Sequence, residues 1–469
     1  MNDTAAPSNS LERFFMVTAK IERHELRAIL VSFFYLFCLM ASYYTIRPLR
    51  DALASEVASE DLKFLWTGTF IFSVVAAVIF SWLISRFKVS SCLPWIYGFF
   101  IINMGIFYML MGAYPLESTE TMMAPIFNTD AFVIFGEVKV SLVVGCSFYI
   151  WLSVFNMFVV SVFWSFLADR YSKEQSKRLF GFVAAGGSAG AAIAPSTMGI
   201  AAAFGLVSAQ GTVIFAAVIL SVTLFCIHDL TTHTSGGHAK GAEKGGSKDK
   251  VGGSTLSGFK TLLQDPYLMA FAVFVALYTF ISTIFYVAQV DLVRAAFETR
   301  ADRYAANAIV DGVVNTLAIF TQMFVTSRVA GKWGLVFLMA VMPIFMFFAF
   351  FALSAFPVLM MILSLQVVRR AGNYAMTRPG REMLWTVVDR DKKYKAKNVI
   401  DGPVYRGADL INIWIENGLR SAGFGLAQIA LVGAGVAAAW SGFAIYLGKT
   451  AEKRKSEIAD AVPESAPAE

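Results

Sequence analysis

The chain has 469 residues, of which 57% are hydrophobic and only 15% charged, and 43 of them are phenylalanine. No soluble domain buries so much apolar surface, so the composition excludes a soluble globular protein and indicates a polytopic membrane protein. The net charge of +6 arises from lysines and arginines in short loops between apolar runs, so we predict no nucleic-acid partner.

Runs of about 20 apolar residues recur along the whole chain, which is the length a helix needs to cross a bilayer. Alternating ten-residue segments typical of barrel strands are absent, so we predict an all-α membrane protein. The twelve predicted spans are 28–52, 62–86, 90–113, 141–168, 178–204, 207–229, 266–292, 305–328, 333–353, 356–377, 398–420 and 422–448.

The first predicted span follows a polar segment, residues 1–27, and ends with two arginines three positions apart, Arg47 and Arg50, preceded by Tyr43. Residues at this spacing share one face of a helix. Two interpretations remain open: the arginines reach interfacial water, or they clamp an anion.

A sequence pattern is repeated before the fifth and eleventh spans. Asp-Arg is followed by a lysine eight residues after the aspartate, in DRYSKEQSK and again in DRDKKYKAK. This repeat predicts two six-helix halves and residues that gate the cytoplasmic entrance. The predicted gating residues are Asp169, Arg170, Lys177, Asp389, Arg390 and Lys397.

The repeat also predicts the domain organisation, with a Gly/Ser/Lys-rich linker between the halves. The predicted ranges are a cytoplasmic N-terminal segment 1–27, an N-terminal half 28–229, a flexible linker 230–258, a C-terminal half 259–448 and a disordered tail 449–469. Lys and Arg gather in alternate loops, which predicts that both termini are cytoplasmic.

Charged residues inside the late spans give the strongest functional signal. Arg369 and Arg370 lie about thirteen residues into an apolar run, roughly 20 Å along a helix, and a cation at that depth needs a partner. In span eight, Asp311 and Asn315 fall on one polar stripe.

In span eleven, three carboxylates share one face of the helix, and Arg406 points away from that face. The carboxylates are Asp401, Asp409 and Glu416.

Neither a metal site nor a nucleophile can be assembled from the four cysteines and four histidines. The cysteines are spread through separate spans, and the histidines lie at the membrane margin or in the linker. We therefore predict that the protein is not an enzyme and uses no cofactor.

Several motifs resemble those of the ATP/ADP translocase-type nucleotide transporters of plastids and intracellular bacteria, which are related to the major facilitator superfamily. They are YYTIRPLRDAL at the end of span one, KEQSKRLFG before span five, and PGREMLW and VDRDKKYKAKNVID around spans ten and eleven. The resemblance implies nucleotide-binding roles for Arg50, for Glu174 or Gln175, for Gln289 in place of a carboxylate and for Arg406 in place of a lysine.

We interpret the chain as a twelve-span, major-facilitator-type bundle of two six-helix halves in a bacterial inner membrane. It is predicted to move a small anionic organic solute by alternating access through a central arginine-lined cavity, with protons or a counter-transported anion as coupling partner. The predicted substrate-binding residues are Tyr43, Arg47, Arg50, Arg369, Arg370, Asn373 and Arg406. The predicted charge-balancing or proton-coupling residues are Asp311, Asn315, Asp401, Asp409 and Glu416.

Two alternatives stay open at this point. One is a proton-coupled major-facilitator transporter of another solute, such as a peptide or a siderophore. The other is a non-transporting membrane protein that handles lipid phosphate or acts as a sensor.

Overall fold

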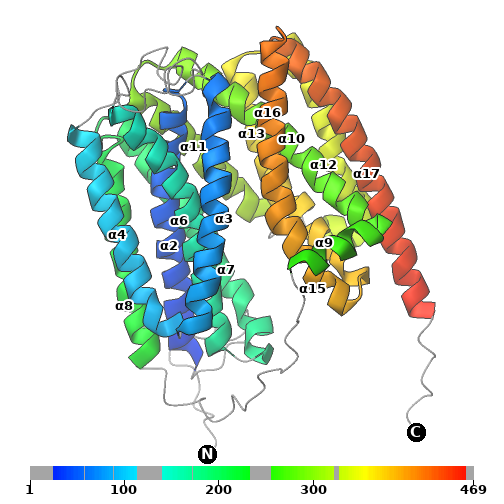
Figure 1. The fold of residues 1–469 in the computed structure, drawn as a ribbon, viewed down its shortest axis with the longest axis horizontal. Helices are drawn as coiled ribbons and strands as arrows, with labels where there is room; N and C mark the ends of the chain where they lie inside the picture. The colour runs from blue at the N-terminus through cyan, green and yellow to red at the C-terminus, as the bar shows by residue number, and fades with distance from the viewer. Residues whose placement is uncertain are drawn as a thin grey trace, which may run out of the picture. The chain divides into compact units, whose positions relative to one another are not determined.

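The computed structural model describes residues 25–57, 59–87, 89–113, 140–171, 173–232, 255–321 and 327–460. Within these ranges every element is helical, and ten helices are long and apolar enough to cross a membrane (Figure 1). The predicted spans 356–377 and 398–420 correspond to two further helical segments that are interrupted. The predicted all-α class is therefore confirmed. Most of the predicted N-terminal segment and linker, and residues 461–469 of the predicted tail, lie outside the described residues.

The described chain divides into two compact units. The first holds the described residues of 1–56, 71–246 and 299–315, and the second those of 57–70, 247–298 and 316–469. The helices of the first unit are α2 (Leu26–Ala54), α3 (Leu62–Arg86) from residue 71 onward, α4 (Val89–Ala113), α6 (Val140–Arg170), α7 (Lys173–Ala203), α8 (Gly211–Thr232) and the first part of α11 (Arg300–Thr321).

Helix α2 is the centre of the first unit and packs against α6, α7 and α8. Its approach to α7 is closest at two glycines one turn apart. A Cβ on Gly186 would lie 2.3 Å from the carbonyl oxygen of Phe33, and one on Gly190 would lie 2.2 Å from that of Phe37. Small residues at this spacing let two membrane helices meet backbone to backbone. The contact fixes the helix that carries Arg47.

The second unit is built around α10 and α17. Its elements are η2 (Ser59–Asp61), the start of α3, α9 (Thr255–Gln264), α10 (Pro266–Ala296), the end of α11, α12 (Ser327–Ala355), α13 (Leu359–Gly372), η4 (Asn373–Thr377), α14 (Arg378–Leu384), η5 (Trp385–Val387), α15 (Arg390–Val399), η6 (Ile400–Val404), α16 (Tyr405–Ser421) and α17 (Leu426–Asp460). Helix α10 packs against α16 and α17, α12 packs against α17, and α9 lies beside α15 (Figure 1).

Two helices of this unit are broken where the sequence predicts continuous spans. A π-helical turn, η4, separates α13 from α14, and a second, η6, separates α15 from α16. Pro403 lies inside η6 and has no N–H to donate, so the regular hydrogen-bond ladder cannot pass through it. π-Turns of this kind are frequent at functional sites.

The C-terminal helix is longer than predicted. The predicted tail begins at residue 449, whereas α17 continues to Asp460. Ala451 is 1% exposed and packs into the apolar core of the second unit, which holds this part of the chain as a helix.

A prediction follows from the glycine contact between α2 and α7. Gly190→Ala forces a methyl group against the Phe37 carbonyl, and overpacking of this kind costs about 1–3 kcal/mol. We expect a lower thermal unfolding temperature for the purified variant. Gly181→Ala is the matched control, because nothing lies within 4 Å of a Cβ at that position of the same helix. Equal unfolding temperatures for the two variants would contradict this packing.

Candidate functional site

Arg369 and Arg370 form the last turn of α13, directly before the π-turn η4. Their side chains are buried, with exposures of 6% and 8%. Asn373, the third predicted residue of this cluster, begins the π-turn and is half-buried. A buried cation in a membrane protein destabilises the fold unless a partner neutralises its charge. The hydrogen-bond and ion-pair partners of Arg369 therefore indicate its role.

The contacts of Arg369 are all to neutral groups. Its Nε and Nη2 donate to Oε1 of Gln366 at 3.0 and 2.7 Å, and its Nη1 donates to the Ser282 hydroxyl at 2.6 Å. The amide of Gln366 in turn donates to Oε1 of Gln289 at 2.8 Å. No carboxylate of the described residues pairs with Arg369. The cluster therefore holds a buried positive charge with neutral ligands.

Helix α16 carries the polar residues predicted for span eleven, but they are spread along its length. Arg406 and Asp409 lie one turn apart, with Nη1 and Oδ2 separated by 4.0 Å. Asn412 faces α10, where its amide donates to the Thr279 hydroxyl at 2.8 Å. Glu416 lies near the far end of the helix and pairs with Arg420.

Asp401 is separate from these residues. It lies in the π-turn η6 and accepts from Nη2 of Arg381 on α14 at 2.6 Å. A second ion pair, Lys397 to Glu382 at 2.6 Å, joins α14 to α15, the helix directly before η6. Sequence analysis did not find Arg381 or Glu382, although both belong to the PGREMLW motif.

In the first unit, Arg47 is neutralised by Asp311. Its Nη1 donates to Oδ1 and Oδ2 of Asp311 at 3.0 and 3.1 Å, and the side chain of the aspartate is 3% exposed. Asn315, one turn further along α11, donates to the carbonyl oxygens of Ala191 and Asp311 at 2.8 Å. The structure thus brings together a predicted anion-binding residue and a predicted charge-balancing one.

The other residues predicted at the end of span one have local partners. Arg50 pairs with the adjacent Asp51 at 2.8 Å, and its guanidinium lies 5.1 Å from the ring centre of Tyr149. Tyr43 is buried and meets Tyr44 edge to face.

A further ion pair in the first unit lies at the end of α2 and was not predicted. Glu56 accepts from Nε and Nη2 of Arg300 at 2.6 and 3.1 Å, and Nη1 of Arg303 donates to the carbonyl oxygen of Ser55 at 3.4 Å. Burial raises the pKa of Glu56 above its usual 4.5, while the hydrogen bond and charge of Arg300 oppose that rise. Neither Arg300 nor Arg303 is among the predicted site residues.

The gating residues can be located only in part. Asp389 is 82% exposed at the side chain and lies 3.9 Å from Lys392, and Arg170 is half-buried at the end of α6. The side chains of Asp169, Lys177 and Arg390 lie outside the described part of the structure.

Comparison with known proteins decides the family. A family model described as TLC ATP/ADP transporter matches residues 4–406. The chain belongs to the TLC ATP/ADP transporter family. A curated relative, ADP,ATP carrier protein 1 of Rickettsia conorii, is 26% identical over 182 residues. That match spans 37% of this chain and 36% of the relative, little more than a third of each.

Solved structures show the fold of this TLC-family transporter. The nucleoside transporter NupG has a TM-score of 0.57 at 12% identity, covering 92% of this chain and 99% of its own. An inward-facing bacterial homologue of the human lysosomal transporter Spinster has a TM-score of 0.56 at 12% identity, covering 95% and 100%. These likenesses confirm the predicted major-facilitator-type bundle. The family assignment, with ten helices long and apolar enough to cross a membrane in the described chain, places the protein among integral membrane transporters and not among enzymes.

The buried ion pair of the TLC-family transporter gives a stability prediction. Asp311→Asn leaves Arg47 without its carboxylate, and breaking a buried pair from one side costs about 3–5 kcal/mol. The double variant Arg47→Gln/Asp311→Asn removes both charges and should recover most of that loss. Thermal or denaturant unfolding of the wild type, both single variants and the double variant measures the coupling energy. Strictly additive losses would contradict the pairing.

The Glu56–Arg300 pair gives a pH prediction. Arg300→Gln removes the group that opposes the rise in the pKa of Glu56, so the folded-state pKa rises further above the unfolded value. A carboxyl with a raised folded-state pKa stabilises the fold at low pH, and that contribution is lost as pH rises through the folded pKa.

We therefore expect the unfolding temperature of Arg300→Gln to fall further below wild type between pH 4 and pH 7. In a Glu56→Gln background the effect of Arg300→Gln should not change with pH. A constant difference in both backgrounds would count against burial of the Glu56 carboxyl.

Proposed function

We propose that this transporter moves an anionic, nucleotide-like organic solute across the bilayer by alternating access, and that Arg369 and Arg370 bind its phosphate or carboxylate group. The observation that carries the proposal is the buried guanidinium of Arg369 with only neutral hydrogen-bond partners. A buried charge without a counter-charge is destabilising, and an anionic ligand supplies the missing charge.

The geometry around Arg369 supports recognition of such a group. A guanidinium has five N–H donors, and three of them donate to Gln366 and Ser282 in the described contacts. Tyr278 is a further neutral hydrogen-bond partner of Arg369, and the N–H that remains can form a charge-assisted bond to a carboxylate or phosphate. Gln289 and Gln366 hold the guanidinium in one orientation without cancelling its charge. A fixed guanidinium loses little freedom when a solute binds.

The arginine of the first unit has a different proposed role. Because Asp311 already neutralises Arg47, the pair is electrically balanced without solute. We propose that Asp311 acts as the charge-balancing residue, as predicted, with Asn315 fixing its backbone. Contacts of Tyr43, Arg50, Asn373 and Arg406 with the solute, and proton-coupling roles for Asp401, Asp409 and Glu416, stay predictions.

The coupling mode and location belong to the same proposal. We propose exchange for a counter-transported anion, because the curated relative is named an ADP,ATP carrier. We place the protein in a bacterial inner membrane with both termini cytoplasmic, following the Lys and Arg content of the loops.

Arg369→Gln tests the site directly. We expect solute affinity to fall by about 30-fold or more, since losing one partner of a buried charged hydrogen bond costs about 2 kcal/mol or more. Folding should be retained or improved, because the substitution removes a buried charge that no described carboxylate balances. Thermal stabilisation by nucleotides, sugar phosphates and nucleosides, followed by uptake into proteoliposomes, measures the effect.

Arg454→Gln is the matched control, because this arginine pairs with Asp265, the N-cap residue of α10, away from the cluster, and should leave solute affinity unchanged. Wild-type affinity for every anionic solute in the Arg369→Gln variant would refute the proposed site. Stabilisation of the wild type by uncharged nucleosides alone would refute an anionic solute.

A further inference from the structure

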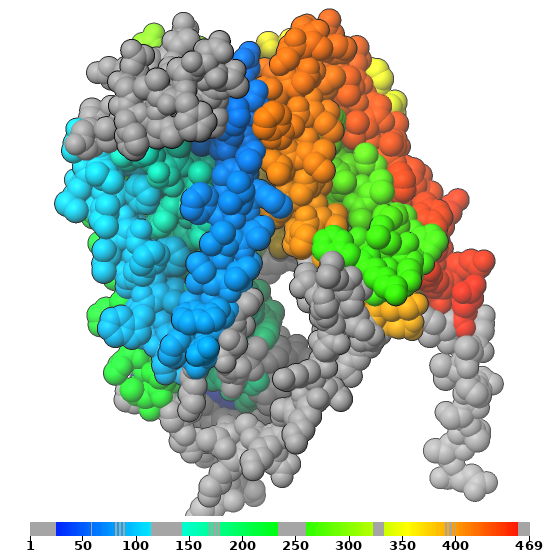
Figure 2. Space-filling view, viewed as in Figure 1, coloured from blue at the N-terminus to red at the C-terminus, as the bar shows by residue number. Residues whose placement is uncertain are grey.

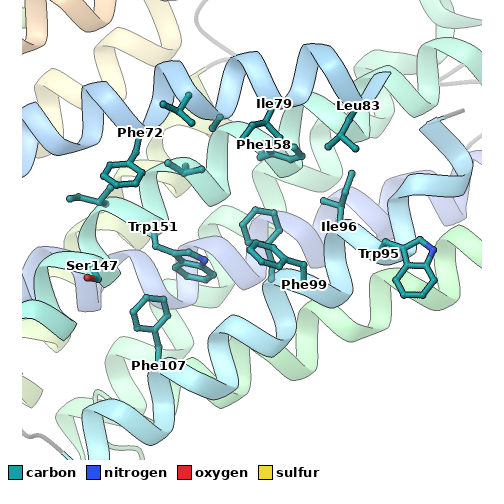
Figure 3. A pocket seen from close by; sticks show the side chains of 15 residues that line it. Phe72, Ile79, Leu83, Trp95, Ile96, Phe99, Phe107, Ser147, Trp151 and Phe158 are labelled. Atoms are coloured by element: carbon teal, nitrogen blue, oxygen red, sulfur yellow. The ribbon is translucent and has the colours of Figure 1, made fainter. Parts of the chain in front are cut away.

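The first unit contains an apolar groove between α3, α4 and α6 that the transport site does not use (Figure 3). Its volume is about 650 Å³, and fourteen of its fifteen lining residues are apolar, with Ser147 as the exception. Trp95 and Leu83 lie toward one end of the groove, and Phe72 and Ser147 lie toward the other.

The groove opens on the outer surface of membrane-spanning helices. Phe72 is 56% exposed, Ile79 48%, Phe99 58% and Trp95 82%. Helices α3 and α4 lie side by side on the face of the molecule shown in Figure 2. Apolar side chains this exposed on membrane-spanning helices contact hydrocarbon, so the groove is shaped for a hydrocarbon chain.

The face of α3 that lines the groove ends at a positively charged residue, Arg86. Phe72, Ile79 and Leu83 recur at helical spacing on one face of α3, and Arg86, three residues further, continues that face as the last residue of the helix. Its side chain is exposed, and no carboxylate of the described residues pairs with it. Trp82 is 53% exposed in the same turn, and such tryptophans mark the membrane interface.

The length of the groove matches one leaflet of the bilayer. Phe72 and Leu83 are eleven residues apart, about 16 Å at 1.5 Å per residue. The hydrocarbon core of a bilayer is about 30 Å thick, so one leaflet contributes about 15 Å. An acyl chain that fills the groove therefore brings the lipid phosphate to the level at which α3 ends, within reach of Arg86.

We propose that this groove is a binding site for an anionic phospholipid, with one acyl chain along α3, α4 and α6 and the phosphate on Arg86. The charge at one end and the apolar lining along the rest select a lipid over other occupants. Binding there adds to the transport function and does not depend on which solute is carried.

Native mass spectrometry of the full-length protein in detergent tests the site, with phosphatidylglycerol and phosphatidylcholine of identical acyl chains as probes. We expect tighter binding of phosphatidylglycerol by the wild type. Arg86→Gln should weaken that preference about fivefold, the contribution of one basic residue near a membrane surface, and Arg86→Lys should retain it.

A second set of variants tests the groove itself. Ile79→Trp and Val75→Trp place an indole in the groove and should reduce retention of both lipids. Val218→Trp is the matched control, since Val218 is 59% exposed on the surface of α8 in the same unit.

Three outcomes would overturn the proposal. The first is equal retention of both lipids by the wild type, which indicates a non-selective lipid shell. The second is a loss of preference in Arg86→Gln with full retention in both groove-filling variants, which places the acyl chain outside the groove. The third is a protein dimer that Ile79→Trp disrupts, which makes a second copy of the chain the occupant.

Discussion

A guanidinium held inside a helical bundle in lipid must be balanced, because water cannot reach it to screen the charge. This constraint accounts for most of the polar structure of the protein. At the end of α2, Arg47 is balanced by Asp311 from α11. At the end of α13, Arg369 is held by amide and hydroxyl oxygens that orient it but leave its charge in place. The first arrangement is electrically balanced, whereas no carboxylate of the residues that the structure describes pairs with Arg369 in the second.

The polar contacts depend on packing that brings the helices into position. Arg47 reaches Asp311 from a helix that meets α7 backbone to backbone at Gly186 and Gly190. In the second unit, Asn412 bonds to Thr279 and so ties α16 to α10, the helix that also supplies Ser282 to Arg369. Each charged cluster is therefore held in position by contacts between neutral or small residues. Nothing in the sequence around those residues indicates that they position a functional site.

Sequence alone could predict the features that follow from helical repeat and hydropathy. The all-α class and the burial of Arg369 and Asp311 each depend on spacing along one helix, which is fixed by the chain. Burial of Asp311 is expected because lipid excludes a carboxylate from an exposed face.

What sequence could not predict is the choice of partner across helices. Asp401 pairs with Arg381, and Glu56 pairs with Arg300; each arginine had several acids available to it in sequence, and tertiary packing decides between them. The π-turns were not predicted, because a single turn with i→i+5 hydrogen bonds leaves no distinct hydrophobic periodicity in the sequence. Pro403 lies within η6, where it interrupts the predicted span 398–420, whereas η4 contains no proline.

The two breaks have a physical consequence for the site. A π-turn releases backbone carbonyls from the regular ladder and lets the helix on one side rotate relative to the other. Because η4 begins directly after Arg370, the segment that follows it can change direction without disturbing the Gln366 and Gln289 contacts that orient Arg369. The Arg381–Asp401 pair joins the segment after η4 to the turn η6, so an ion pair links the two breaks. In the proposed alternating-access mechanism, Arg369 keeps its position while the segment beyond η4 changes direction.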